Sequence, residues 1–187
     1  MAAEMKRELL DGERVFLVHD FLAPDSCEAL IQRSEALGYD AVTIDGEVYT
    51  DFRSNSRVIL DDAELADTLW QRASEHVPPV IDEQPAAGLN PRIRFYRYSG
   101  GEAFIPHHDG LVRIGELESK LTFMVYLNDL AEGGETRFYG PGPTVLFDVR
   151  PERGKAVFFE HLILHEGVAV EEGCKYVLRT DVMYGES

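Results

Sequence analysis

Hydrophobic positions recur at helical spacing in two segments of the first ninety residues. In the first segment, 22–39, the apolar residues at this spacing are Ala29, Leu30 and Ala36. Asp25 or Ser26 is placed to cap this helix, because both side chains accept hydrogen bonds from free backbone N–H groups. In the second segment, 61–77, the apolar stripe consists of Leu65, Leu69, Trp70 and Ala73. The pattern therefore predicts two amphipathic helices.

From residue 91 onward, the pattern changes to short apolar runs separated by glycine and proline. These runs are "RIRFYRY", "LTFMVYLND", "TVLFDV", "GKAVFFEH" and "KYVLRTDVMY", and an earlier run, "RVFLVHDF", precedes the first helix. Several short strands at this spacing are typical of a sandwich or a barrel. We expect an antiparallel β-core of about eight strands, braced on one side by the two helices.

The segment 154–184 is typical of a hairpin whose turn is the "EEG" sequence. Antiparallel register would then place His165 roughly opposite Arg179 in the last strand. Period-two alternation puts Lys175, Arg179 and Asp181 on one face of that strand. The other face is mostly apolar and contains Cys174, Tyr176, Leu178 and Val182. The charged face is either solvated or lines the barrel interior, and the hairpin register favours the interior.

The composition favours a globular domain and argues against nucleic-acid and membrane binding. A chain of 187 residues with 44% hydrophobic residues is expected to form one domain with a real core. The 34 acidic residues outnumber 18 basic ones, for a formal net charge of −16. Nucleic acids and anionic membranes are therefore poor candidates for partners, since binding them requires clustered lysine and arginine.

The chain has no apolar run close to the roughly 20 residues that span a bilayer. The first fifteen residues carry charges where a signal peptide needs an apolar stretch. Cys27 and Cys174 have no metal-finger or redox spacing, so we expect ordinary thiols in a reducing compartment. These features together predict a soluble, cytoplasmic protein.

The stretch "YRYSGGEAFIPHHDG", residues 96–110, contains two histidines and an aspartate within three positions. If it is extended, His107 and Asp109 share one face and His108 takes the other. A third metal ligand would come from His161 or His165, and the strand pattern favours His165. Two imidazoles and one carboxylate form the facial triad that suits non-heme Fe(II) and leaves coordination positions open. The alternative is that these polar residues only satisfy local hydrogen bonds.

The motifs "DFLAPDSCEALI", "YSGGEAFIPHHDG", "LTFMVYLND", "GGETRF" and "PERGKAVFFEHLILHEGVAV" occur in this order and lead to Lys175. With them, the sequence closely resembles the Fe(II)- and 2-oxoglutarate-dependent dioxygenases, in particular their prolyl 4-hydroxylase-like branch. The resemblance covers nearly the whole chain and implies a double-stranded β-helix, or jelly-roll, braced by N-terminal helices. Within one domain, 1–90 would form the helical support and lid region and 91–187 the catalytic β-core.

The resemblance also implies cofactors and their ligands. Fe(II) would be bound by His107, Asp109 and His165, with 2-oxoglutarate and O2 as cosubstrates and ascorbate as a further reductant. Lys175 stands where this branch has its basic anchor for the distal carboxylate of 2-oxoglutarate. Arg179 would then meet the substrate or the chelating end near the metal, although the two roles could be exchanged. Tyr98 and Tyr126 match positions that line the site, and packing is the alternative for both.

The leading functional hypothesis is hydroxylation of an amino-acid residue, with proline implied by the resemblance, in a peptide or protein substrate. The alternatives are the same chemistry on a small molecule and a non-catalytic jelly-roll binding module. The combination of the triad with Lys175 argues against a non-catalytic module. The segment 43–58 resembles a lid, in which Tyr49, Arg53 and Arg57 either contact substrate or form exposed surface.

Overall fold

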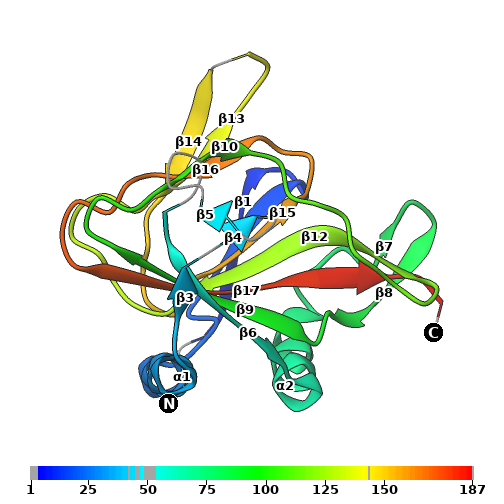
Figure 1. The fold of residues 1–187 in the computed structure, drawn as a ribbon. Coiled ribbons are helices and arrows are strands. Elements are labelled where there is room, and N and C mark those ends of the chain that lie inside the picture. Colours follow the sequence, from blue (N-terminus) through cyan, green and yellow to red (C-terminus); the bar gives the residue numbers. More distant parts are fainter. Residues whose placement is uncertain (1–3, 42, 45–46, 49–53, 143, 187) are drawn as a thin grey trace.

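The computed structural model describes residues 4–41, 43–44, 47–48, 54–142 and 144–186. The framework of the fold is two curled antiparallel sheets that face each other (Figure 1). The large sheet has 11 strands. Its main path is β1 (Lys6–Asp11), β2 (Val15–His19), β15 (Ala156–Glu160), β12 (Leu117–Tyr126), β17 (Cys174–Tyr184), β9 (Arg92–Ser99), β6 (Ser56–Asp61) and β3 (Asp40–Ala41). The short strands β7 (Val80–Ile81), β8 (Gln84–Leu89) and β11 (Arg113–Ile114) pair alongside this path.

The small sheet has four strands, in the order β10 (Phe104–His107), β16 (His165–Gly167), β13 (Thr136–Tyr139) and β14 (Val145–Val149). A separate two-stranded ribbon is formed by β4 (Thr43–Ile44) and β5 (Glu47–Val48). The hairpin of β13 and β14 projects at the top of Figure 1. Strands β1 to β8 lie within residues 1–90. This region therefore supplies several strands in addition to the helical support that the sequence predicts for it.

Two helices, α1 (Pro24–Leu37) and α2 (Ala63–Ala73), lie on the same side of the large sheet, away from the small sheet (Figure 1). Helix α2 begins after Asp62, whose side chain accepts a hydrogen bond from the backbone N–H of Leu65. Its stripe packs as predicted, with Leu69 and Ala73 buried. Among the described residues, neither helix has the length and apolar character needed to cross a membrane.

The predicted cap of helix α1 is wrong, and of its predicted stripe only Leu30 packs against the core. The helix begins with Pro24, and no side chain caps it. Proline suits this position because its missing N–H would have no intrahelical partner there. The buried residues are Cys27 and Ser34, whereas Ala29 and Ala36 are exposed.

A hydrophobic core lies on each side of the large sheet. The outer core joins the sheet to the two helices through residues such as Phe95, Leu178 and Val182. The inner core lies between the two sheets and includes Tyr98 and Tyr126. Alternate residues of one strand thus enter different cores, which fixes the strand register because a shift by one residue would exchange the two faces.

The predicted hairpin of residues 154–184 is wrong. Strand β15 pairs with β12 and β2, and β17 pairs with β12, β9 and β8, while β16 crosses to the small sheet and pairs with β10 and β13. Arg179 is therefore opposite Met124 and Arg94, not His165. The expected alternation of β17 is confirmed, because Lys175 and Asp181 are buried on the inner face and Leu178 on the outer face.

Replacing Phe158 with alanine is expected to lower the free energy of unfolding by about 3–5 kcal/mol. The Phe158 ring is fully buried, and its centroid lies 4.8 Å from that of Phe16 and 4.7 Å from that of Phe123. Urea denaturation followed by circular dichroism measures the change. Leu162→Ala is the control, since this side chain is 81% exposed and its loss should cost within about 0.5 kcal/mol. Equal losses in the two variants would contradict the packing described for Phe158.

Candidate functional site

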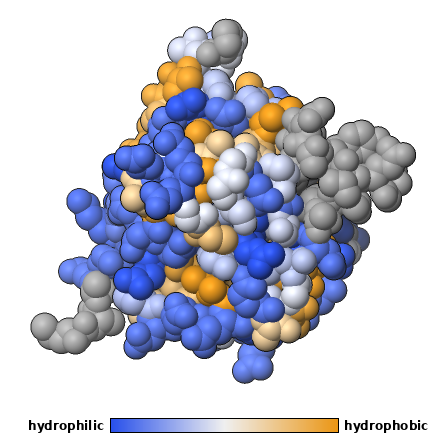
Figure 2. Space-filling model, turned by 60° about the vertical axis from the view of Figure 1, so that its left-hand side comes forward, coloured by the Kyte–Doolittle hydropathy of each residue, from blue (hydrophilic) through white to orange (hydrophobic). Residues whose placement is uncertain are grey.

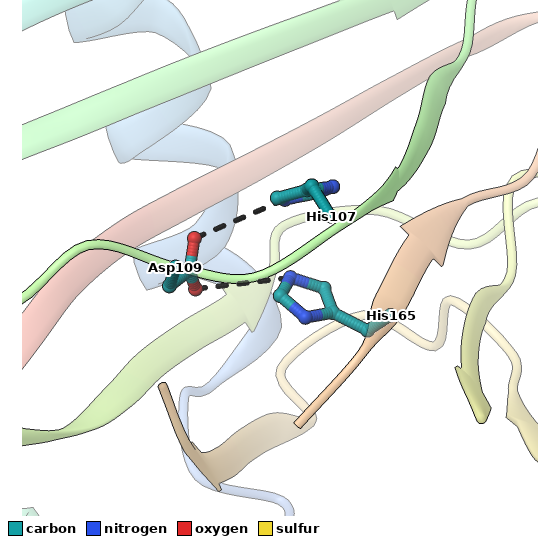
Figure 3. Close-up of side chains that lie close together, drawn as sticks. All are labelled: His107, Asp109 and His165. Atoms are coloured by element: carbon teal, nitrogen blue, oxygen red, sulfur yellow. Dashed lines mark ion pairs between the residues drawn. The ribbon is translucent and has the colours of Figure 1, made fainter. Parts of the chain in front are cut away.

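Three polar side chains converge at the mouth of the space between the sheets (Figure 3). His107 is the last residue of β10, His165 is the first of β16, and the two residues are paired across the strands. Asp109 follows β10, and its backbone N–H donates to the carbonyl of His161 at 2.9 Å. Its carboxylate oxygens lie 3.8 Å from Nε2 of His107 and 3.7 Å from Nε2 of His165.

Backbone carbonyls orient both imidazole rings. Nδ1 of His107 lies 2.8 Å from the carbonyl oxygen of Ile105, and Nδ1 of His165 lies 2.9 Å from that of Ile163. A carbonyl only accepts hydrogen bonds, so each Nδ1 bears the proton and each Nε2 presents a lone pair. Both lone pairs are therefore available on the side facing Asp109, as a metal ligand requires.

Asp109 is ionised in this environment. Burial by itself would raise the pKa of its carboxyl, but the guanidinium of Arg179, the ring of His165 and a hydrogen bond from Thr122 outweigh burial and hold the pKa well below the usual range. Nη2 of Arg179 lies 3.1 Å from Oδ2, and Thr122 Oγ1 donates to the same oxygen at 2.6 Å. Burial also lowers the pKa of His165, which favours its neutral form.

This arrangement fits a divalent metal ion. One ligand atom from each of His107, Asp109 and His165 can be chosen so that all three lie within 4.8 Å of one another. Metal–ligand bonds of about 2.1 Å at right angles separate neighbouring ligand atoms by about 3 Å, so small side-chain movements complete the site. Two neutral imidazoles and one carboxylate on a single face are typical of non-heme Fe(II). His108 is exposed and is not part of this group.

A cavity of about 450 Å³ extends inward from these residues. The inner faces of β6, β9, β12 and β17 in the large sheet form one wall, and β10, β13 and β16 in the small sheet form the opposite wall. Side chains along it include Tyr98, Phe104, Thr136, Lys175, Val177 and Arg179. Thr136 and Lys175 are buried, whereas His107 and Asp109 are partly accessible.

Lys175 is a buried cation in this cavity. Its side chain is 3% exposed, and its Nζ lies 5.2 Å from the ring centroid of Tyr98 and 5.4 Å from that of Tyr126. No carboxylate of the described residues forms an ion pair with it. Burial lowers its pKa to about 7, although Glu135 acts in the opposite direction. An anionic ligand in the cavity would supply the missing charge partner.

Residues 93–180, which span the triad and Lys175, match the 2OG-Fe(II) oxygenase superfamily. Prolyl 4-hydroxylase 1 of Arabidopsis thaliana is 29% identical over 165 residues, covering 78% of this chain and 57% of that protein. The chain spans about half the length of the curated relatives it matches.

Solved structures of prolyl hydroxylases have a similar fold. The viral collagen prolyl hydroxylase from Paramecium Bursaria Chlorella virus-1 superposes with a TM-score of 0.64 at 20% identity, covering 94% of this chain and 99% of that one. A prolyl hydroxylase from Trichoplax adhaerens, in complex with a hypoxia inducible factor peptide fragment, gives 0.71 at 17% identity, covering 92% and 84%. The predicted jelly-roll core with N-terminal helices is confirmed.

Tyr98 and Tyr126, the two tyrosines that the sequence suggests for the site, both lie near Lys175. Tyr98 lines the cavity with one edge, and it is 6% exposed. Tyr126 is fully buried, and its hydroxyl donates to Oγ1 of Thr136 at 2.6 Å. Tyr126 therefore does not line the cavity itself. It packs in the core and holds the side chain of Thr136, which does line the cavity.

His161 is linked to Asp109 through Thr122. It is buried, and its Nδ1 lies 2.9 Å from Thr122 Oγ1, while its Nε2 lies 2.8 Å from Ser119 Oγ. Because the Thr122 hydroxyl donates to Asp109, Nδ1 of His161 must donate to Thr122. His161, the other candidate for the third ligand, is therefore not part of the group of possible metal ligands. His19 is the last residue of β2 and pairs with Glu8.

Sequence reasoning missed Thr122 and Arg94, which both line the cavity. Strand alternation could have identified both, because residues four apart on a strand lie on the same face. Thr122 lies four residues before Tyr126. Arg94 lies four residues before Tyr98. Of the predicted lid residues, Arg57 lines the cavity, whereas Tyr49 and Arg53 lie outside the described residues.

Proposed function

We propose that this protein is an Fe(II)- and 2-oxoglutarate-dependent dioxygenase that hydroxylates an amino-acid residue, with proline as the first candidate, in a peptide or protein. The observation that supports this most directly is one cavity with the His107, Asp109 and His165 group at its mouth and the buried Lys175 inside. A dicarboxylate can bind the metal with one end and pair with Lys175 at the other.

Each residue would have a distinct role. Nε2 of His107, the carboxylate of Asp109 and Nε2 of His165 would hold Fe(II) on one face. Bound Fe(II) would supply the chemistry that couples conversion of 2-oxoglutarate and O2 into succinate and CO2 to hydroxylation of a C–H bond. Lys175 would pair with the distal carboxylate of 2-oxoglutarate. Arg179 would hold Asp109 in position and present its remaining N–H groups to the ligands in the cavity.

The proposed substrate class draws on the relatives. The Trichoplax adhaerens structure is described as a prolyl hydroxylase with a bound peptide fragment, and the curated plant relatives are described as prolyl 4-hydroxylases. A peptide substrate suits the cavity, because its mouth lies at the edge of the small sheet, where an extended chain can reach the triad.

The remaining partners and the compartment are proposed from charge and cysteine chemistry. The face in Figure 2 is mostly hydrophilic, in keeping with the formal net charge of −16, so nucleic acid is not proposed as a substrate. Cys27 and Cys174 are free thiols, which supports the cytoplasm as a reducing compartment.

The test is a turnover screen with purified protein, Fe(II), 2-oxoglutarate, ascorbate and a library of proline-containing peptides. We expect succinate release that a subset of peptides stimulates, and mass spectrometry should find one added oxygen atom on a residue of those peptides. Stimulation by a metabolite pool and by no peptide would move the substrate to small molecules. The absence of succinate release under all conditions would refute the proposed activity.

A further inference from the structure

Three arginines from adjacent strands of the large sheet line the same cavity wall. Arg57 lies on β6, Arg94 on β9 and Arg179 on β17. Arg94 is directly opposite Arg179, and Arg57 is opposite Tyr96, two residues further along β9. Residues two apart on a strand share a face, so all three guanidinium groups belong to the inner side of the sheet.

Carboxylates already balance two of these groups. Asp181 is fully buried beneath them, with one oxygen 3.3 Å from Arg179 and the other 3.3 Å from Arg94. The amide of Asn90 also donates to Asp181, at 3.1 Å. Asp109 forms the second ion pair of Arg179, at 3.1 Å. The cluster is thus fixed by buried partners rather than by solvent.

Among the residues that the structure describes, Arg57 is the member of the cluster without a carboxylate partner. It forms no ion pair with any residue that the structure describes, and its side chain is half-buried at the cavity. It lies two strands away from β17, or roughly 9–10 Å across the sheet. Lys175 and the metal already suffice for the two carboxylates of 2-oxoglutarate. A cation at this place, in a protein with a net charge of −16, requires another explanation.

We propose that Arg57, with Arg94 beside it, binds a carboxylate of the substrate and so selects peptides with an acidic residue close to the residue that is hydroxylated. This inference rests on the proposed function of the same cavity. A guanidinium group can form two parallel hydrogen bonds with a carboxylate, and partial burial strengthens such a pair. Arg57 is a specificity-determining residue in this view, separate from the metal-binding group and from Lys175.

Equilibrium binding under anaerobic conditions tests the proposal without turnover. The full chain is loaded with Fe(II) and 2-oxoglutarate and titrated into fluorescein-labelled peptides with one central proline. One peptide set places a single glutamate at each neighbouring position in turn, and a matched set has glutamine instead. We expect glutamate to improve affinity about tenfold over glutamine at one or two positions.

Variants of Arg57 should change this preference in a predictable direction. In Arg57→Gln the difference between glutamate and glutamine should disappear, and Arg57→Glu should favour a peptide with lysine at the same position. Arg92→Gln is the matched control, because Arg92 lies on β9 with an exposed side chain, pairs with Asp61 and does not line the cavity. It removes the same charge and should keep the preference for glutamate. Circular dichroism verifies that each variant is folded.

Several results would overturn the inference. These are equal binding of the glutamate and glutamine sets by the wild-type protein, no binding of any peptide, or a preference that survives in Arg57→Gln. Weaker 2-oxoglutarate binding in Arg57→Gln would assign this arginine to the cosubstrate and would also overturn it. A glutamate preference without succinate release in any assay would refute the dioxygenase activity and leave the role of Arg57 intact.

Discussion

His165→Ala is expected to reduce the rate of succinate release by more than about 100-fold. Replacing a residue that only orients a metal ligand costs up to about 100-fold, and loss of a ligand itself should cost more. The same result is expected for His107→Ala and Asp109→Ala. Each variant removes one of three donor atoms that lie within 4.8 Å of one another, so metal affinity and turnover should fall together. Equilibrium dialysis of Fe(II) and a succinate assay at saturating 2-oxoglutarate measure the two effects.

The control for the metal site is His108→Ala. This histidine is adjacent to two of the proposed ligands in sequence, but it is exposed and does not belong to the group of possible metal ligands. Its replacement should leave one Fe(II) bound per chain. If His108→Ala removed the metal while His107→Ala retained it, the assignment of ligands in this segment would be wrong.

Lys175→Met is expected to weaken 2-oxoglutarate binding by about 30-fold or more, because one carboxylate of the ligand would be buried without a charge partner. Methionine keeps the length and apolar contacts of the lysine stem. Isothermal titration of the metal-loaded protein measures the affinity. Arg179→Gln is the comparison variant, and it should mainly reduce substrate-coupled turnover. If Arg179→Gln weakened 2-oxoglutarate binding and Lys175→Met did not, the two roles would be exchanged.

The same lysine predicts a pH dependence of 2-oxoglutarate affinity. Burial lowers the pKa of Lys175 to about 7 in the free protein, so the ammonium group loses its proton as pH rises above that value. Binding of the dicarboxylate requires the protonated form and therefore takes up a proton. Affinity should be highest below pH 7 and should fall by up to about tenfold per pH unit above it. Lys175→Met should lose this dependence, and titrations in buffers of different ionisation enthalpy detect the proton.

Strand periodicity predicts correctly which residues of β17 face the cavity, but the predicted pairing of this strand is wrong. The alternation of Lys175 and Arg179 with Leu178 identified the inner face of β17, because each face enters a different core. The sequence does not state which sheet a strand joins, and β16 is only three residues long. Simple hairpin geometry therefore failed there. The proximity of Arg179 to the triad still holds, but it comes from the ion pair with Asp109 across the two sheets.

Other features were missed because their signals are weak. Strand β1 has no fully buried side chain and lies at the edge of the sheet, so it lacks the apolar alternation used to recognise strands. Arg57 was placed in a lid, and its pairing with β9 became evident only from the fold. Alternation identifies the face of Asp181, but its position between Arg94 and Arg179 depends on the pairing of β9 with β17, two strands that are distant in sequence.

The two histidines of the triad both belong to the small sheet, whereas Asp109 is held by Arg179 of the large sheet. A metal ion bound by all three would therefore act as a cross-link between the sheets. Short strands such as β10 and β16 are the segments most prone to local opening, and a ligand that binds only the closed arrangement shifts that opening equilibrium. Metal loading and closure of the small sheet are in this sense a single equilibrium, so scarcity of the metal would loosen the open end of the barrel as well as stop its chemistry.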